Sequence, residues 1–470
     1  MKKQFKEIPG SIVAPKGFKA GGVFCDIKRL GTGKGSNKGR KRDLAIIISE
    51  VPAMVAGMFT TNQVCAAPVK VCIERVKQGT AQAIVVNSGN ANACTGKQGL
   101  KDAMEMTRLA ACTVAVPLCG VSSRPSSSRK GQPRSDERSY GLPVERVLVA
   151  STGRIGVTLP MANVKRGISE AAKLLGNSSR HAAHAVEAIM TSDTRPKQIA
   201  VEFKLGGETV RMGGICKGAG MIQPGMSTNG RRPAALSQGG LHATMLCFIT
   251  TDAAIEAKIL QAALREAVAQ SFNRITVDGD MSTNDTVLVL ANGLAGNRKF
   301  GVWSSEFGIF QAALNHVCLE LAKMIVRDGE GVHRVVTVRV NGAKTVADAD
   351  VAARAVANSP LVKTSWHGGD PNWGRIIDAL GYSPAKIVEE KVDIGYSMPA
   401  SQQILWSLKR GQPTKATFKQ LCAAVAPKEF DLHIHLNLGR SGAVIYAADL
   451  TEAYVDFNKG DVGDPGSLGG

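Results

Sequence analysis

Short apolar runs rich in β-branched residues alternate along the chain with segments of helical periodicity. The runs predict strands at residues 43–49, 83–87, 146–151, 245–250, 286–291, 335–340 and 432–438. The periodic segments predict helices at residues 100–115, 161–175, 181–190, 253–270, 304–327 and 344–358. The clearest stripe of apolar residues at steps of three and four comprises Phe307, Phe310, Leu314, Val317, Leu321 and Met324. Because no regular strand-helix-strand rhythm appears, the pattern predicts an α+β layered fold.

Three segments interrupt this pattern. Residues 121–141 and 227–242 are rich in Ser, Gly, Arg and Pro and predict loops or insertions outside the core. Residues 31–42 are rich in Gly and Lys, but they lack the G-x-x-x-x-G-K-[ST] pattern and a strand directly before it. They therefore predict a flexible basic hairpin tip and not a phosphate-binding loop.

Length and charge narrow the function classes. At 470 residues, 44% hydrophobic and 21% charged, the chain predicts two or three domains, or one large domain with a lobe. A net charge of +19 would favour nucleic acid or acidic membranes as partners. However, fifteen of these charges come from residues 1–42, 121–141 and 227–242, which contribute ten, three and two. With 5% aromatic residues and no base-stacking platform, we expect neither a nucleic-acid nor a membrane partner.

The cysteines and the N-terminus bear on the compartment. Ten cysteines are scattered without a C-x-x-C pair or a zinc-type Cys/His spacing, which predicts small buried hydrophobes in a reducing compartment and no metal. Neither a secretory signal nor an apolar window of membrane-spanning length is evident. We expect a soluble cytoplasmic protein, or a mitochondrial or plastid matrix protein if the source is eukaryotic.

Candidate chemistry lies in short blocks rich in Gly, Asn, Thr and Asp. Such blocks suit a small polar molecule resembling an amino acid, because Gly permits close backbone approach and short polar side chains direct hydrogen bonds. The alternatives are local: Asx turns at 87–96, a β-hairpin connection at 277–286, and a turn before a helix at 368–375. Without a G-x-S-x-G or H-E-x-x-H motif, the commonest hydrolases and zinc enzymes are disfavoured. The blocks are 59–69, 87–96, 151–156, 190–197, 217–221, 243–252, 277–286, 328–331 and 368–375.

In this order, the motifs FTTNQVCAAPV, NSGNANACTG, STGRIG, KGAGM, ATMLCFITTDA, SFNRITVDGDMSTNDT, RDGEG, SPLVK and GGDPNWGR closely resemble the ornithine acetyltransferase family. These are the bifunctional glutamate N-acetyltransferases of arginine biosynthesis, and the resemblance extends from about Gly17 to Asn458. It implies an N-terminal-nucleophile-like α/β/β/α sandwich with an additional C-terminal lobe. It also implies self-cleavage between Ala243 and Thr244, giving an α chain of residues 1–243 and a β chain of residues 244–470.

The resemblance further implies a ping-pong acetyl transfer from N2-acetylornithine to glutamate, through an acetyl group on Thr244. The freed α-amine of that residue would serve as the base for its hydroxyl. Thr152 and Gly153 match the oxyanion hole. The matching substrate-binding positions are Thr191, Lys217, Thr244, Glu330 and Asn458. No cofactor is implied, acetyl-CoA remains open as a second donor, and the α and β chains are expected to assemble as a heterotetramer.

The sequence departs from the family pattern in three places. The family nucleophile follows the KGAGM lysine by eleven residues, which here is Thr228, whereas the matching ATMLCFITTDA context begins sixteen residues later at Thr244. We favour Thr244, because Thr228 precedes an Asn-Gly turn signal. Ser192 replaces a threonine. Gly463 stands where the family has a Thr or Ser five residues after Asn458, and Ser467 is not assigned to that role.

Three other readings follow from the same residues. The insertion 227–242 could block maturation and leave an uncleaved, inactive homologue. The same nucleophile could serve an aminopeptidase or amidase. The basic surplus could belong to a nucleic-acid-binding protein, whose binding would be salt-sensitive and independent of Thr244.

Overall fold

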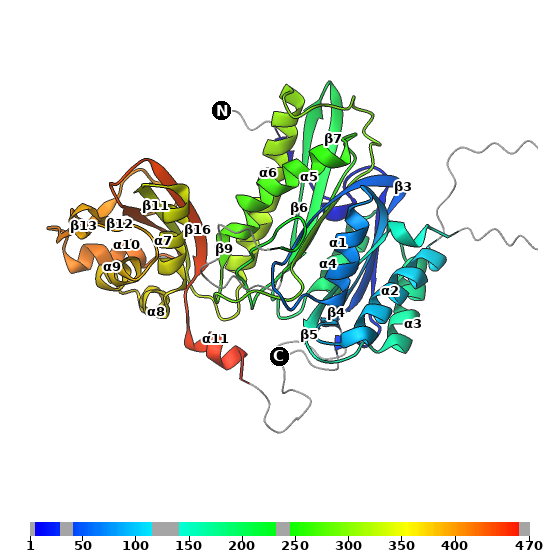
Figure 1. The fold of residues 1–470 in the computed structure, drawn as a ribbon, viewed down its shortest axis with the longest axis horizontal. Helices are drawn as coiled ribbons and strands as arrows, with labels where there is room; N and C mark the ends of the chain where they lie inside the picture. Colours follow the sequence, from blue (N-terminus) through cyan, green and yellow to red (C-terminus); the bar gives the residue numbers. More distant parts are fainter. Residues whose placement is uncertain (1–4, 29–40, 115–140, 232–244, 460–470) are drawn as a thin grey trace, which may run out of the picture.

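The computed structural model describes residues 5–28, 41–114, 141–231 and 245–459. Figure 1 shows two bodies side by side, each with its own β-sheet and its own helices. This confirms the expected mixture of helices and sheets. The elements of the first body come from both the N-terminal half and the middle of the chain, whereas the second body is formed mainly by the C-terminal part.

The first sheet has nine strands among the described residues, in the order β1-β6-β7-β8-β10-β3-β4-β5, with β2 also paired to β3. The first half of the 16-residue strand β3 pairs with β2 and β4, and its second half pairs with β10. One long strand therefore joins both parts of the sheet. The bounds are β1 Phe5–Glu7, β2 Phe18–Val23, β3 Leu44–Phe59, β4 Thr80–Asn90, β5 Val147–Arg154, β6 Lys197–Leu205, β7 Glu208–Lys217, β8 Leu246–Thr251 and β10 Thr286–Ala291.

Two hydrophobic cores lie on this sheet. One includes residues of α1–α4, and the other includes residues of α5 and α6. In β8, Leu246 and Phe248 belong to the first core while Cys247 and Ile249 belong to the second. A strand buried on both faces carries apolar side chains at every position, which explains the unbroken apolar run. The helices are α1 Ala67–Val76, α2 Gly96–Thr113, α3 Met161–Lys173, α4 Ser179–Ile189, α5 Ala257–Ala269 and α6 Ser305–Arg327.

The second sheet has seven strands among the described residues, in the order β14-β13-β12-β15-β11-β16-β9, and a third core covers it. Helix α7 packs on β11 and β16. The strands are β9 Ile275–Thr276, β11 Val335–Ala343, β12 Asp393–Ser397, β13 Leu405–Lys409, β14 Gln412–Pro413, β15 Glu429–His435 and β16 Ser441–Ala448. The helices are α7 Val346–Asn358, α8 Pro360–Gly368, α9 Trp373–Gly381, α10 Phe418–Val425 and α11 Glu452–Phe457.

Each strand and helix expected from the sequence occurs, with shifted ends. The hairpin interpretation of residues 277–286 is wrong, because β9 pairs with β16 in the second sheet while β10 pairs with β8 and β3 in the first. The block thus connects the two bodies. The turn before a helix at 368–375 is confirmed, since the Asn372 side chain caps α9 by accepting the N–H of Arg375.

Other expectations need correction or fall outside the described part. Helix α6 is long and apolar enough to cross a membrane by length and composition, contrary to the expectation that no such window exists. Phe310, Leu314, Val317 and Leu321 nevertheless belong to the core, so α6 packs as an interior helix. Of the three interrupting segments, only residues 41–42, 141 and 227–231 lie within the described ranges.

We expect Gly213→Ala to lower the thermal unfolding midpoint, because a Cβ there would lie 1.8 Å from the carbonyl oxygen of Ser11. Overpacking of this kind costs about 1–3 kcal/mol. Gly308→Ala is the matched control, since this exposed position in α6 has open space for a Cβ. There the change should raise the free energy of unfolding by up to about 1 kcal/mol, because alanine favours the helix more than glycine does. Differential scanning calorimetry of both variants measures the two shifts, and equal shifts would contradict the packing argument.

Candidate active site

The start of β8 is fixed between two neighbouring strands. The N–H of Met245 donates to Asp285 Oδ1 at 2.7 Å, and its carbonyl accepts the N–H of Thr286 at 3.1 Å. On the other side, Lys217 is in register with Leu246. Ala243 and Thr244, with the predicted scissile bond, lie outside the described residues. The residue that directly follows the predicted nucleophile is thus held at the centre of the first sheet.

Lys217 is a buried cation at the end of β7. Its Nζ donates to Thr152 Oγ1 at 3.3 Å. Burial lowers the pKa of the Lys217 ammonium, while the charges of Asp193, Glu330 and Asp285 oppose that shift. Two residues that the sequence assigns to different roles, Thr152 and Lys217, are therefore in direct contact.

Gly153 occupies a backbone position that excludes a side chain. Its φ is +127°, and a Cβ would lie 2.4 Å from the carbonyl carbon of Gly89 in the neighbouring strand β4. The β4–β5 register shifts at this point, between Gly89 and Asn90. Glycine is needed here because two backbones approach closely next to Thr152.

Asp193 links the predicted substrate-binding residues through its carboxylate. Oδ2 accepts the N–H of Thr191 at 2.9 Å, and Oδ1 accepts the N–H of Gly218 at 2.7 Å and the Nζ of Lys197 at 2.6 Å. Burial alone would raise the pKa of Asp193, but the ammonium groups of Lys197 and Lys217 outweigh it and hold the pKa well below its usual range. Lys197 also pairs with Asp328.

Glu330 follows α6 and lies against the segment after Lys217. Its N–H donates to the carbonyl of Ala219 at 2.9 Å, and a Cβ at Gly220 would lie 2.3 Å from its Oε2. Asn458, which follows α11, donates from Nδ2 to Glu330 Oε2 at 3.1 Å. Burial raises the pKa of the Glu330 carboxyl, against hydrogen bonds from Ser192 and Asn458.

Asp285 is a buried carboxyl to which sequence reasoning gave no role. Oδ1 accepts the Met245 N–H, whereas Oδ2 has no hydrogen-bond partner among the described residues. Burial raises its pKa well above the usual range. Asp193 and Lys197 were missed as well, although their i, i+4 spacing in a polar block was visible in the sequence. Asp285 stands directly before an apolar strand run, and that was its one signal.

The block 87–96 lies beside this region and contains the expected Asx turn. The N–H of Asn92 donates to Asn90 Oδ1 at 2.8 Å. From the block 277–286, Asn284 Nδ2 donates to the carbonyls of Ala91 at 2.7 Å and Ser151 at 2.8 Å. Three polar blocks thus meet next to Thr152.

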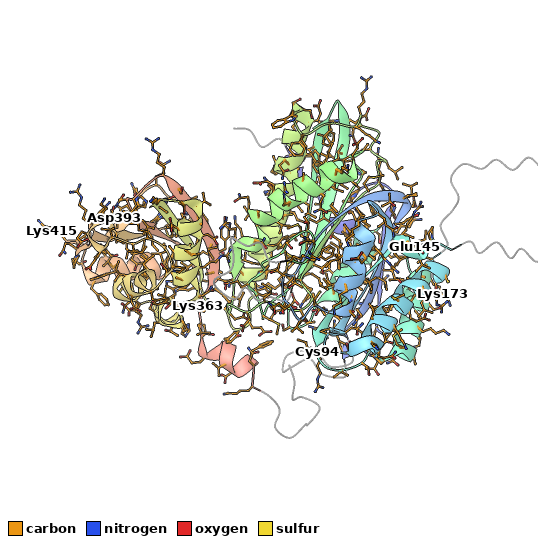
Figure 2. All side chains as sticks on the ribbon, in the orientation of Figure 1. Cys94, Glu145, Lys173, Lys363, Asp393 and Lys415 are labelled. Atoms are coloured by element: carbon orange, nitrogen blue, oxygen red, sulfur yellow. The ribbon has the colours of Figure 1, made fainter. Side chains whose placement is uncertain are left out.

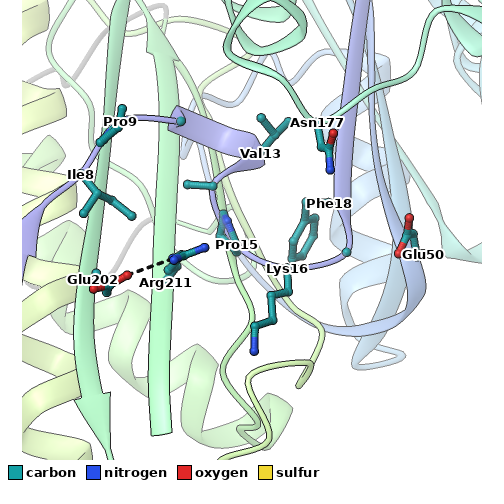
Figure 3. A pocket seen from close by; sticks show the side chains of 13 residues that line it. Ile8, Pro9, Val13, Pro15, Lys16, Phe18, Glu50, Asn177, Glu202 and Arg211 are labelled. Atoms are coloured by element: carbon teal, nitrogen blue, oxygen red, sulfur yellow. Dashed lines mark hydrogen bonds and ion pairs between the residues drawn. The ribbon is translucent and has the colours of Figure 1, made fainter.

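Two cavities lie outside the Lys217 region. Figure 3 shows one of about 590 Å³, beside Lys16 and the Glu202–Arg211 ion pair, and none of the predicted site residues that the structure describes lines it. A second, of about 470 Å³, is lined by Gln63 and Asn92 among others and lies where the blocks 59–69 and 87–96 meet. The described site residues are therefore linked by direct contacts, and they line neither cavity.

Comparisons with known proteins identify similar chains. A model described as the ArgJ family matches residues 29–460. A relative from Symbiobacterium thermophilum named arginine biosynthesis bifunctional protein ArgJ is 44% identical over 96% of this chain and 98% of its own. One from Methanocaldococcus jannaschii named glutamate N-acetyltransferase is also 44% identical, with the same coverage. A solved structure of ornithine acetyltransferase complexed with ornithine from Mycobacterium tuberculosis is 32% identical, covering 47% of this chain and 100% of its own, with a TM-score of 0.38.

We expect Lys197→Met to lower the free energy of unfolding by about 3–5 kcal/mol near neutral pH, because it strands two buried carboxylates, Asp193 and Asp328. Lys77→Met is the control: Lys77 forms an exposed pair with Glu74 and should change stability by less than about 1 kcal/mol. Denaturant titration followed by circular dichroism measures both.

The pH dependence has a definite sign. The pKa of Asp193 is lower in the folded protein than in the unfolded chain, where it is about 3.9. Its ionised form therefore stabilises the fold at pH values above the unfolded pKa, and this contribution is lost as the pH falls through the folded pKa. The gap between wild type and Lys197→Met should therefore narrow in acid. A gap that stays constant down to the acid transition would contradict the ion-pair explanation.

Proposed function

The chain belongs to the ArgJ family, and on that premise we propose that it transfers an acetyl group from N2-acetylornithine to L-glutamate, giving ornithine and N-acetylglutamate. The observation that carries the proposal is the contact of Lys217 with Thr152, with Glu330 and Asp193 within electrostatic reach of Lys217. A buried ammonium with carboxylates within electrostatic reach suits a zwitterionic substrate, which carries both signs of charge. Its name places the Methanocaldococcus jannaschii relative in the same reaction class.

We propose that Thr244 is the nucleophile, freed by self-cleavage after Ala243 into chains of residues 1–243 and 244–470. The position of β8 supports stable association of the two chains afterwards. β8 would be the first strand of the second chain, yet it lies between β7 of the first chain and β10. Both chains would then share one sheet, in keeping with a layered α/β/β/α N-terminal-nucleophile fold.

In the first half of the reaction, the Thr244 hydroxyl attacks the acetyl carbonyl and its α-amine accepts the proton. An α-amine with a pKa near 8 can be neutral at cellular pH. The negative charge that develops on the carbonyl oxygen would be stabilised by the Thr152 hydroxyl and the Gly153 N–H. Lys217 donates to Thr152 Oγ1, which leaves the Thr152 O–H free to donate to the oxyanion. Ornithine leaves as its amine takes up the proton, and the acetyl group remains on Thr244.

In the second half, the amino group of glutamate attacks the acetyl-threonine, and the same groups return the proton to Thr244. Lys217 has three N–H donors, of which one is used by Thr152, so the others can bind the substrate carboxylate. Glu330, which accepts a hydrogen bond from Asn458, would bind an amino group. Thr191 is held by the Asp193 carboxylate, which accepts its N–H. Asp285 Oδ2 is available to accept a hydrogen bond from the α-amine of Thr244.

Two finer parts of the proposal rest on the family resemblance alone. Acetyl-CoA would be a second acetyl donor, and two α and two β chains would form a heterotetramer. An uncleaved inactive homologue and an aminopeptidase or amidase are the competing outcomes of the tests below.

We expect the wild type to give two shorter bands on a denaturing gel and a single species on native sizing, because the fragments share the first sheet. Thr244→Ala should give one band near 49.5 kDa and no acetyl exchange. Thr228→Ala is the matched control: this exposed turn residue should leave both cleavage and exchange unchanged. N-terminal sequencing of the smaller fragment identifies the cleaved bond.

A fragment beginning at Thr228 would overturn the assignment of the nucleophile. A single band for wild type would favour the uncleaved homologue. Two bands with hydrolysis of acetylornithine but no ornithine-dependent exchange would favour the amidase.

We expect Thr152→Val to lower kcat about 10²–10³-fold with a small change in KM, because it removes one oxyanion donor and keeps the shape of the side chain. Thr113→Val serves as the control, since this exposed threonine bonds the carbonyl of Leu109 in its own helix and contributes to no predicted site. Steady-state acetyl exchange measures both variants. An unchanged kcat, or a change confined to KM, would remove Thr152 from the oxyanion hole.

A further inference from the structure

Three potential metal ligands meet away from the proposed active site. His333 lies before β11, His367 lies in α8 and Asp449 follows β16, and one ligand atom from each lies within 4.8 Å of the others. His333 and His367 are 34 residues apart in the sequence, and His367 and Asp449 are 82 apart, so no short motif predicts this cluster. The tertiary structure alone brings them together.

Asp449 places an unpartnered buried oxygen in this cluster. Its side chain is fully buried, and Oδ1 accepts the N–H of His333 at 3.0 Å. Oδ2 has no hydrogen-bond partner among the described residues and lies 3.6 Å from Nδ1 of His367, which also lacks one. That distance is too long for a hydrogen bond. It is close to the roughly 3.3 Å that separates two ligands of one tetrahedral zinc ion with bonds of about 2.0 Å.

The second ring nitrogen of His367 is held by a carboxylate. Nε2 lies 2.8 Å from Glu452 Oε2, and because a carboxylate accepts, Nε2 is the donor. The Nδ1 of His367 can then present its lone pair toward Asp449 Oδ2. A carboxylate that orients a ligating histidine through its other nitrogen is the usual support of a metal ligand.

Two cationic side chains of this region, Lys363 and Arg334, bond to backbone carbonyls. Lys363 donates from Nζ to the carbonyl of Ala448, and Figure 2 labels it on the second body. Arg334 donates to the carbonyls of Trp366 and His367. Neither supplies a hydrogen bond to Asp449 Oδ2, so within the described ranges the buried oxygen has no hydrogen-bond partner, and His367 Nδ1 lies 3.6 Å from it.

We propose that His333, His367 and Asp449 bind one divalent zinc-class cation. Two imidazoles and one carboxylate are the ligands that such an ion prefers, whereas magnesium and calcium prefer oxygen alone. Three protein ligands leave one position open for water. His333 is exposed, so the ion can enter from solvent.

The site would connect the metal to the proposed active site through α11. Glu452 begins this helix, and Asn458 at its end donates to Glu330, three residues before His333. Figure 1 shows α11 leading away from the second body beneath both bodies. A bound ion would hold His367, which bonds Glu452 at the start of α11, and His333, which lies close in sequence to Glu330. An effect on the active site rests on the proposed function, whereas the binding of the ion does not.

The test is zinc titration of the full-length protein by isothermal calorimetry, after iodoacetamide has blocked the exposed Cys94 and Cys112. We expect one equivalent to bind wild type. His333→Gln and His367→Gln should each weaken binding at least tenfold, since even supporting partners of metal ligands contribute about 10–100-fold. His316→Gln is the matched control, because this histidine of α6 pairs with Glu7 at 3.0 Å and packs against the ring of Phe5, not against the His333–His367–Asp449 cluster. X-ray absorption should show nitrogen and oxygen neighbours near 2.0–2.1 Å and no sulfur at 2.3 Å.

The proposal would be overturned by no zinc binding to the wild type, by wild-type affinity in either site variant, or by sulfur ligation. Hydrogen exchange of α11 gives a separate readout and should slow on zinc addition in wild type but not in His367→Gln. Zinc binding should persist in Thr244→Ala. Failure of the metal site and failure of the acetyl-transfer proposal are thereby distinguished.

Discussion

The pairing of β8 between β7 and β10 is the constraint on which the other features depend. β8 runs antiparallel to β7 and parallel to β10, and its side chains enter two different cores. Its first residues can shift only if both cores are disturbed. The same pairing sets Lys217 beside Leu246 and Asp285 beside Met245. The chemistry proposed for Thr244 therefore begins from a backbone that the sheet holds in place.

This arrangement buries several charged side chains, and linked ion pairs and hydrogen bonds compensate most of those charges. Asp193 accepts from Lys197 and from the backbone of Gly218 and Thr191, while Asp328 shares Lys197. Such a network stabilises each charge only while every partner is present. Asp285 differs from Asp193, because one of its oxygens has no hydrogen-bond partner among the described residues. A carboxyl oxygen without a hydrogen-bond partner, next to the start of β8, can accept a hydrogen bond from a further polar group.

Polar contacts join the two bodies at the segment that follows Lys217. Asp278, in the segment that connects the two sheets, accepts the N–H groups of Met221 at 2.6 Å and Ile222 at 2.8 Å. Tyr454 of α11 donates to the same carboxylate at 3.3 Å. The segment after Lys217, the connection between the sheets and the C-terminal helix thus share one anchor. A change in the position of α11 would reach Glu330 through Asn458.

The sequence by itself determined the elements and the family. Apolar runs and helical stripes such as the one in α6 follow from local periodicity, and long motifs in fixed order identified the relatives. The sequence did not reveal that residues 277–286 connect two sheets, because strand pairing depends on partners far away in the chain. It assigned roles to Lys217 and Glu330 through resemblance, but it gave none to Asp193, Asp285 or the His333–His367–Asp449 cluster. Those roles arise from burial and from distances between remote residues, and only the tertiary structure decides which charges lose their water and which partners replace it.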